Sequence, residues 1–326
     1  GKWEGEIRLG GAVVAGVSSA LTAGEELADP VPLKENENLA FIGSYVLGMG
    51  FTLTPAEATA LIAKDRRNAE VIQPYIGGEE LNSNPRMAHE RYVINFRDWP
   101  LEKAEEWPDL IEILREKVKP ERDLVPEDRS REVWWQFSRR RPDLYALLEG
   151  KSRCLLNCQV SRNPQFAFQP LPRTFAHTLN VYPIDDILRF AVLQSRIHEH
   201  WARLLGSSMK TDLRYTPSTC LATFPFPRPS PAQQIALAES GQALYDARSA
   251  LMLRDEIGMT KAWNRVVNPH DDDPAVVELR ALRDTMDRTV LAAYGWSDLE
   301  PTDKPAILTR LRALNTKRKA EEGRKG

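Results

Sequence analysis

The chain changes character near residue 228, and that change constrains its fold more than any other feature. Residues 39–227 contain short apolar segments separated by proline and glycine, a pattern typical of strands mixed with short helices. Residues 228–326 contain long segments of helical periodicity instead. The sequence therefore predicts an α+β fold, in which a mixed, β-rich domain at 39–227 precedes a small all-helical domain at 228–326. Residues 1–38 are expected to be a lead-in, or a connector from a further domain.

Local patterns place individual elements within this frame. Thr54 is expected to cap a helix that starts at Pro55, and Glu57 stands where a capping box needs it. Further helices are expected at 100–118 with a break at Pro108, at 185–205, from Pro231 to about Ile257, from Asp273 to about Tyr294 and from Lys304 onward. Extended segments are expected at 41–54, 91–96, 131–137, 152–161, 165–171 and 178–184, and a strand that runs into a turn is expected within 68–81.

The segment 208–215, which reads SMKTDLRY, alternates strictly between apolar and charged side chains. Because a β-strand points successive side chains to opposite faces, this pattern predicts one strand with a packed face and a charged face. The charged face carries Lys210, Asp212 and Arg214. Two interpretations are open at this point: a solvated edge that discourages pairing with other chains, or a surface that reads a polar ligand.

Composition sets limits on the class of protein. Hydrophobic residues make up 42% and charged residues 28%, and no apolar run reaches the ~18 residues of a membrane span. Three cysteines form no disulfide framework, which favours a reducing cytoplasm. The net charge of −2 does not by itself indicate a nucleic-acid ligand. Basic residues are nevertheless concentrated locally, because nine Lys and Arg outnumber six Asp and Glu from Arg115 to Arg141.

Three motifs resemble catalytic or metal sites and fail on spacing or context. The stretch Asn163–Phe166, NPQF, resembles the Asn-Pro-Pro-Tyr/Phe loop of amino-methyltransferases, but it lacks the second proline and no Gly-rich cofactor turn precedes it. His198 and His200 are two residues apart on an expected helix, so they do not share a face. Cys154 and Cys158 have no second ligand pair at zinc-site spacing. We therefore expect no catalytic, cofactor-binding or metal-binding residues in this chain.

A set of short motifs occurs in order along the chain and together carries a family resemblance. They read FIGSYVLGMGF, NAEVIQPYIGGEELNS, RYVINFRDWPLEKAE, KVKPERD, WWQFSRRRPDLY, LQSRIHEHWA, GSSMKTDLRYTPSTC, TFPFP and AAYGW. Across residues 1–300 the chain resembles the C-terminal part of the MmeI-like, type IIG or IIL, single-chain restriction-modification methylases. In the stretch CLATFPFP, the residues before Phe-Pro-Phe-Pro differ from the aromatic and acidic residues usual in that family. We expect this difference to affect packing rather than the readout of DNA bases.

The resemblance implies that residues 39–227 are a target recognition domain for double-stranded DNA, followed by the C-terminal helical domain of these enzymes. It assigns base readout to Lys210 and Asp212, with Arg214 reading an adjacent base or holding a phosphate. Lys donates to guanine O6 and N7 and Asp accepts from cytosine N4, so the pair suits one G·C base pair.

Contacts to the DNA backbone are expected from basic side chains elsewhere in the chain. The expected backbone contacts are Lys117, Lys119, Arg122, Arg139, Arg140 and Arg141. Arg162, Gln165, Arg173 and Trp135 are possible additional contacts. Trp134 and Trp135 are adjacent on an expected strand, so one of the two should face inward and the other outward.

The resemblance also implies an activity for the parent protein. That activity is adenine-N6 methylation with S-adenosylmethionine, coupled to Mg-dependent cleavage of unmodified DNA in phage defence. The methyltransferase and nuclease parts are absent from this chain, so its partners would be double-stranded DNA and a methyltransferase domain in cis or in trans. An alternative stays open, in which the chain is a separately encoded specificity or scaffold subunit of a defence complex. Either reading places it in the cytoplasm of a bacterium or archaeon.

Overall fold

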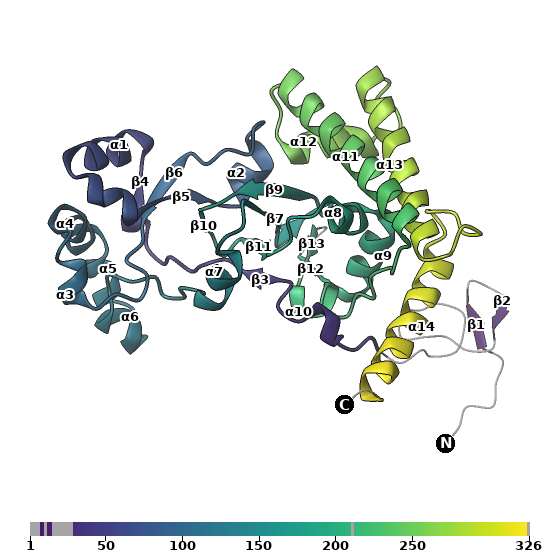
Figure 1. Cartoon of the computed structure of the whole chain (residues 1–326), viewed down its shortest axis with the longest axis horizontal. Coiled ribbons are helices and arrows are strands. Elements are labelled where there is room, and N and C mark those ends of the chain that lie inside the picture. The colour runs from purple at the N-terminus through teal and green to yellow at the C-terminus, as the bar shows by residue number, and fades with distance from the viewer. Residues whose placement is uncertain (1–6, 10–11, 15–28, 210–211, 325–326) are drawn as a thin grey trace.

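The chain folds into two lobes that lie side by side along the longest axis of the molecule (Figure 1). A computed structural model describes residues 7–9, 12–14, 29–209 and 212–324. The N-terminal lobe, residues 46–137, has a hydrophobic core of its own, to which only Ala176 is added from the rest of the chain. Two further clusters of buried side chains lie mainly in the C-terminal lobe, residues 152–323, and the larger one also takes in Ile76, Leu81, Met87, Leu144 and Leu148. The α+β class predicted from the sequence is confirmed.

The N-terminal lobe is built on a four-stranded sheet in the order β10-β5-β6-β4. Its strands are β4 (Thr52–Leu53), β5 (Ile72–Ile76), β6 (Arg91–Ile94) and β10 (Thr174–Phe175). Strand β10 comes from far along the chain and pairs parallel with β5, so the sheet joins the two lobes. The lobe's helices and 3₁₀ turns are η2 (Met49–Phe51), α1 (Pro55–Lys64), η3 (Arg66–Glu70), α2 (Gly78–Ser83), α3 (Leu101–Ala104), α4 (Pro108–Lys117), α5 (Lys119–Asp123) and α6 (Asp128–Glu132).

Helix α1 begins where the sequence places it. The side chain of Thr54 accepts a hydrogen bond from Glu57 N, and the Glu57 carboxylate accepts one from Thr54 N at 2.8 Å. This reciprocal pair satisfies two amide donors that the helix start leaves free. The predicted break at Pro108 is also confirmed, because α3 ends at Ala104 and α4 starts at the proline.

The C-terminal lobe is built on a second four-stranded sheet, in the order β3-β11-β7-β9, whose pairs are all antiparallel. Its inner strands β7 and β11 are almost wholly buried. Helix α2 contacts β7 and helix α8 contacts β9. The strands are β3 (Phe41–Ile42), β7 (Arg153–Cys158), β9 (Phe166–Pro170) and β11 (Leu179–Tyr182). Helix α8 is Ile187–Gln194, α9 is Arg196–Leu205, and the short helices α7 and α10 are Pro142–Leu148 and Pro217–Cys220.

Long C-terminal helices pack on this second sheet and share its core. Leu156 and Val181 of the sheet lie in the same buried cluster as Leu244 and Leu291 of the helices. Gly241 allows close contact, because a Cβ there would lie 2.9 Å from the Ala191 Cβ of α8. The helices are α11 (Pro231–Arg254), α12 (Met259–Val267), α13 (Pro274–Ala293) and α14 (Lys304–Gly323). The three helices predicted in this region are present, and α12 was not predicted.

Two predicted elements are wrong in detail. The segment 131–137, expected to be extended, is the end of α6 followed by a turn. The helix expected at 185–205 is two helices, because Ser195 ends α8 and caps α9 with its hydroxyl. Three further elements near the N-terminus are β1 (Ile7–Leu9), β2 (Ala12–Val14) and η1 (Lys34–Asn36). Within the described ranges, no helix is both long and apolar enough to cross a membrane.

Candidate nucleic-acid interface

The charged segment 208–215 forms a hairpin rather than the single strand predicted from its alternation. Strand β12 (Ser207–Met209) pairs antiparallel with β13 (Asp212–Arg214), and β13 also pairs with β8 (Val160–Ser161). Lys210 lies outside the described residues, between the two strands. The prediction failed because strict alternation is also compatible with a reversal of the chain, and residue pattern alone does not distinguish the two.

Within β13 the predicted alternation holds. Leu213 and Tyr215 are 6% and 2% exposed, whereas Asp212 is half-buried and Arg214 is exposed. No side-chain hydrogen bond or ion pair engages Asp212 or Arg214 within the part of the chain that the structure describes. The two side chains share one face of a strand, about 7 Å apart, and both are free to contact a ligand.

The base of the hairpin is fixed by close backbone contacts. A Cβ on Gly206 would lie 2.5 Å from Leu213 Cδ1, so a larger residue there would push β12 away from β13. Tyr215 N donates a hydrogen bond to Gln159 O at 2.7 Å, which ties the end of β13 to the residue before β8. Strand pairing and this hydrogen bond therefore attach the three short strands to one another at the base of the hairpin.

A buried polar network lies directly below β13. The hydroxyl of Tyr215 is 2.9 Å from His198 Nε2, and Asn180 Nδ2 donates to Tyr215 O at 3.3 Å. Asn157 Oδ1 accepts from both Asn180 Nδ2 and the hydroxyl of Tyr182, at 3.0 and 2.9 Å. Burial lowers the pKa of His198 to about 3, so the imidazole is neutral at pH 7. Burial likewise raises the pKa of Tyr182 and Tyr215 well above their usual range. A neutral, hydrogen-bonded network of this kind fixes the strand that it supports.

The histidine pair and the cysteine pair, which the sequence analysis rejected as metal sites, have structural roles. His198 takes part in the network described above, and His200 Nε2 is 3.1 Å from Pro301 O. Cys154 and Cys158 are buried free thiols, and burial raises the pKa of each to about 12. Within the described ranges, no group of three or more His, Cys, Asp and Glu side chains is placed to hold a metal ion.

An aromatic and cationic strip continues from the hairpin toward the N-terminal lobe. The guanidinium of Arg139 lies 5.0 Å from the ring centre of Tyr45, and that ring stacks on His177 at 4.4 Å. His177 O accepts a hydrogen bond from Gln159 Nε2 at 2.7 Å, which joins the stack to the start of β8. We call Arg139, Tyr45, His177 and Gln159 the hairpin flank. Sequence analysis missed Tyr45 and His177, because the alternation around Tyr45 indicates a strand and says nothing about stacking.

The three consecutive arginines expected to bind DNA together are separated by the fold. Arg139 belongs to the hairpin flank, whereas Arg140 lines a cavity on the side of helix α7. Arg141 is the residue before α7, with a left-handed backbone (φ 59°), and its Nε is buried without a hydrogen-bond partner. Of the three, only Arg139 lies next to the hairpin.

Other proposed DNA contacts lie on the surface. Arg162 is exposed and directly follows β8, and no ion pair holds its side chain within the described residues. Lys119 pairs with Asp123 at 2.9 Å, and Lys117 lies 3.9 Å from Glu57. Both lysine pairs are exposed, so a phosphate can displace the carboxylate at little cost.

Four of the proposed DNA contacts are buried, Arg122, Gln165, Trp135 and Arg173, and the first three are therefore removed from the proposed DNA surface. Arg122 is 1% exposed, and its Nη2 donates to Val46 O and Gln136 O at 2.9 and 3.2 Å. Gln165 accepts from Arg248 Nη1 at 3.2 Å inside the C-terminal lobe. Each of these two side chains is held by hydrogen bonds in the interior of its own lobe.

The third of these is Trp135, whose indole Nε1 donates to Trp99 O at 2.9 Å. Trp134 and Trp135 are 6% and 7% exposed, so the expectation that one of them faces outward is wrong. It rested on a strand at 131–137, and the turn found there directs both rings into the core of the N-terminal lobe. Arg173, a further proposed contact, is also buried but lines the cavity beside α7.

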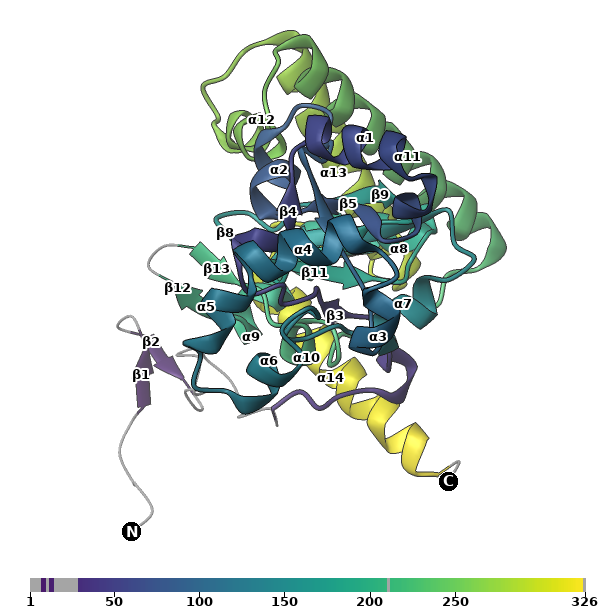
Figure 2. The same ribbon diagram turned by 90° about the vertical axis from the view of Figure 1, so that its left-hand side faces the viewer.

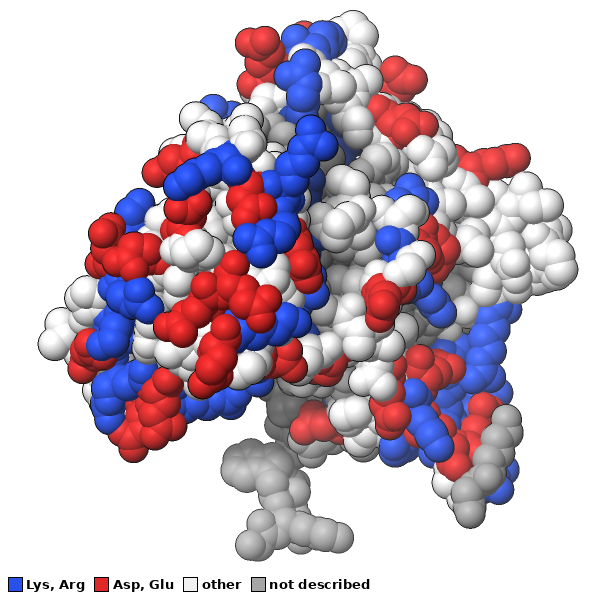
Figure 3. All heavy atoms as spheres, turned by 60° about the vertical axis from the view of Figure 1, so that its left-hand side comes forward, with Lys and Arg blue, Asp and Glu red and all other residues white. Residues whose placement is uncertain are grey.

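Charges of both signs are interspersed over the N-terminal lobe (Figure 3). No broad face of one sign appears in that view, in keeping with a net charge of −2. The side chains of Arg139, Arg162 and Arg214, unpaired among the described residues, are therefore individual cations at particular positions and not parts of a broad basic surface. An α+β scaffold that presents a free carboxylate and a free guanidinium on a braced hairpin has the features of a polar binding surface, and defines the chain as a binding module.

Comparison with known proteins identifies the kind of module. Residues 31–228 match the family model described as MmeI, target recognition domain, so the chain belongs to that family. DNA methyltransferase A of Bacillus subtilis (strain 168) is 29% identical over 126 residues, which are 38% of this chain and 13% of that protein.

A solved structure gives the same fold over almost the whole chain. The type IIL restriction-modification enzyme MmeI, solved in complex with DNA, superposes with a TM-score of 0.73 at 16% sequence identity. The match covers 95% of this chain and 39% of the MmeI chain. This chain therefore spans less than half the length of either relative.

Proposed function

We propose that this chain is the DNA sequence-recognition module of a restriction-modification enzyme, and that the β12–β13 hairpin reads base edges in a short duplex site. The observation that carries the proposal is the free, alternating pair Asp212 and Arg214 on a braced strand. Asp accepts from cytosine N4, and Arg donates in bidentate fashion to guanine O6 and N7. Their spacing of about 7 Å is about twice the ~3.4 Å rise per base pair, so the two side chains suit different base pairs rather than one base. Lys210, which lies outside the described residues, is proposed as the partner of Asp212 on one G·C pair.

Phosphate contacts would set the register of the duplex on this surface. Arg162 directly follows β8, the strand that pairs with β13, and Arg139 belongs to the hairpin flank. Lys117 and Lys119 lie in helices α4 and α5 of the N-terminal lobe. Stacking on Tyr45 holds the Arg139 guanidinium in place, which lowers the entropy lost on binding a phosphate. These contacts contribute affinity and position, whereas Asp212 and Arg214 contribute sequence preference.

The module would act with an adenine-N6 methyltransferase that uses S-adenosylmethionine, and with a Mg-dependent nuclease. Both relatives found by comparison are longer than this chain and are named a DNA methyltransferase and a restriction-modification enzyme. This supports a methyltransferase in the same polypeptide over a separately encoded subunit. The target adenine would leave the duplex stack to react in the methyltransferase domain, while this chain holds the flanking sequence.

Methylome sequencing tests this function directly. Cells that express the full-length protein are expected to carry methyl groups on adenine in one short, asymmetric motif. The double variant Lys210→Glu/Asp212→Arg reverses donor and acceptor at the hairpin, so one base of that motif should change. Asp272→Arg, which alters an exposed and unpaired carboxylate after α12, serves as the matched control and should leave the motif as it is. A motif that the double variant leaves unchanged would remove the hairpin from the readout.

A further inference from the structure

A cavity of about 580 Å³ opens between the two lobes, beside helix α7. Its wall takes residues from β5, from the loop after β6, from α7 and from the loop between β9 and β10. Helix α7 and the β12–β13 hairpin lie on opposite sides of the molecule in Figure 2. The cavity is therefore separate from the proposed readout surface, and a ligand bound there is not a base read by the hairpin.

A buried cation without a counter-charge lies in the wall of this cavity. Arg173 is 9% exposed, and its two Nη atoms meet only neutral groups, Gln169 Oε1 and His89 Nδ1, the second at 3.4 Å. Its Nε has no hydrogen-bond partner, and no carboxylate lies within ion-pair distance among the described residues. A guanidinium taken out of water without an anion is costly, and such groups in proteins are nearly always paired.

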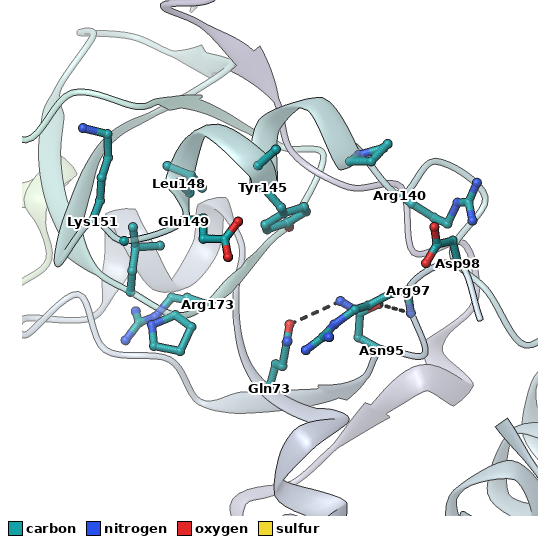
Figure 4. A pocket seen from close by; sticks show the side chains of 15 residues that line it. Gln73, Asn95, Arg97, Asp98, Arg140, Tyr145, Leu148, Glu149, Lys151 and Arg173 are labelled. Atoms are coloured by element: carbon teal, nitrogen blue, oxygen red, sulfur yellow. Dashed lines mark hydrogen bonds between the residues drawn. The ribbon is translucent and has the colours of Figure 1, made fainter. Parts of the chain in front are cut away.

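Additional donors point to the same kind of ligand. Arg97 and Arg140 line the cavity, and neither forms an ion pair within the described part of the chain. The Oε1 of Gln73 accepts hydrogen bonds from both Asn95 Nδ2 and the Thr174 hydroxyl, at 3.2 and 2.7 Å. Because its oxygen is occupied, Gln73 offers its Nε2 amide as a further donor. Figure 4 shows Gln73 and Arg97 across the cavity from the side chains of α7.

The cavity also has acidic lining residues, which limit what fits. Glu149 and Asp98 are exposed carboxylates of the wall, and neither lies within 4.0 Å of a lining arginine. Lys151 is paired with Asp185 at 3.3 Å. Three unpaired arginines therefore face two carboxylates, so the ligand needs an anionic group and also N–H donors. A nucleotide has both, in its phosphate and in its base.

We propose that this cavity binds the phosphate of a nucleotide, with Arg173 at its floor and Arg97 and Arg140 at its rim. The volume admits one nucleotide unit, and the guanidinium fork matches two phosphate oxygens. The nucleotide is either a free mononucleotide or a unit of a DNA strand that passes this side of the molecule. Since both lobes contribute to the wall, a bound phosphate would tie them together.

Binding to a free nucleotide is measured on the whole chain by isothermal titration with dAMP and with inorganic phosphate, at fixed ionic strength. Thermal unfolding is followed in parallel, because a ligand that binds only the folded state raises the melting temperature. The double variant Arg97→Ala/Arg140→Ala should weaken dAMP binding about tenfold or more, since two charge-assisted contacts are lost. The matched control is Arg86→Ala, which removes an exposed, unpaired arginine that does not line the cavity.

The DNA source is tested by the salt dependence of duplex binding. If dAMP does not bind, the double variant should lower the slope of log K against log salt concentration by about two. A variant that changes neither dAMP binding nor this slope would overturn the proposal. The double variant leaves the buried Arg173 in place and should fold, because Arg97 is exposed and Arg140 is only half-buried.

The dAMP measurement is independent of the role proposed for the hairpin, whereas the salt-dependence measurement rests on the proposed binding of duplex DNA. Asp212→Ala should leave dAMP binding unchanged, because β13, the strand that contains Asp212, and α7 lie on opposite sides of the molecule in Figure 2. Loss of sequence discrimination with intact nucleotide binding would therefore leave the cavity proposal standing, and the reverse result would leave the hairpin proposal standing.

Discussion

The change Asp212→Ala provides the sharpest test of how the hairpin works. Asp212 has no internal hydrogen bond or ion pair within the described residues, and β13 is held by backbone pairing and by the buried Leu213. Removing the carboxylate should therefore change the free energy of unfolding by less than about 0.5 kcal/mol. Any large effect on DNA binding would then come from a lost DNA contact and not from unfolding.

The expected loss lies in discrimination at one base pair. A well-placed contact between a side chain and a base edge contributes about 1–3 kcal/mol, which is roughly a 5- to 150-fold preference. Asp212→Ala should reduce the ratio of affinities for the preferred and other bases at that position toward one. The preferences at the other positions of the motif should not change. Binding is measured by competition between duplexes that differ at a single position of the methylated motif, at one fixed salt concentration.

Control and refutation follow from the same structure. Asp272→Ala removes the same charge from an exposed site after α12 and should leave every preference unchanged. Equal weakening on all duplexes would refute base readout by Asp212, because it would show a general electrostatic role. Unchanged binding and unchanged preference would place Asp212 outside the interface altogether.

Three further outcomes are expected. Arg139→Ala should lower the slope of log K against log salt concentration by about one, and Arg86→Ala should not; equal slopes would remove the hairpin flank from the phosphate contacts. Arg122→Met should lower the free energy of unfolding in urea by about 1–3 kcal/mol for each of the two carbonyls left unpaired, whereas Lys117→Ala should cost under about 0.5 kcal/mol. Burial lowers the pKa of His198 from its ordinary value of 6.5 to about 3. Between these two pH values His198 is protonated in the unfolded chain and neutral in the folded chain. Its contribution to stability is present above pH 6.5 and is lost as the pH falls, by up to about 1.4 kcal/mol per pH unit, and His198→Phe should flatten that part of the profile.

The buried network explains why a short hairpin can act as a defined surface. Two strands of three residues are marginally stable alone, and here they gain order from β8 and from the neutral groups beneath. Tyr215 connects these levels, since its amide bonds to Gln159 and its hydroxyl to His198. Substitutions in that buried network should alter base readout by the hairpin, although the substituted side chains themselves do not contact DNA.

Local chemistry made part of this protein predictable from its sequence. The capping box at Thr54, the break at Pro108 and the C-terminal helices follow from rules that act within a few residues. The packed and free faces of 212–215 also follow from local alternation. The family resemblance, confirmed by the match over residues 31–228, came from ordered motifs and not from any physical pattern.

Tertiary structure alone decided which polar side chains remain free. Arg139 and Arg140 are neighbours in the sequence, yet one stacks on Tyr45 and the other lines a cavity. Arg122 and Gln165 look like surface residues in the sequence but are buried against distant partners. Burial depends on contacts between segments far apart in the chain, so composition and periodicity do not determine it. The sequence by itself determined which segments form helices or strands and which charged and polar side chains the chain carries. The packing of the two lobes decided which of those side chains remain exposed.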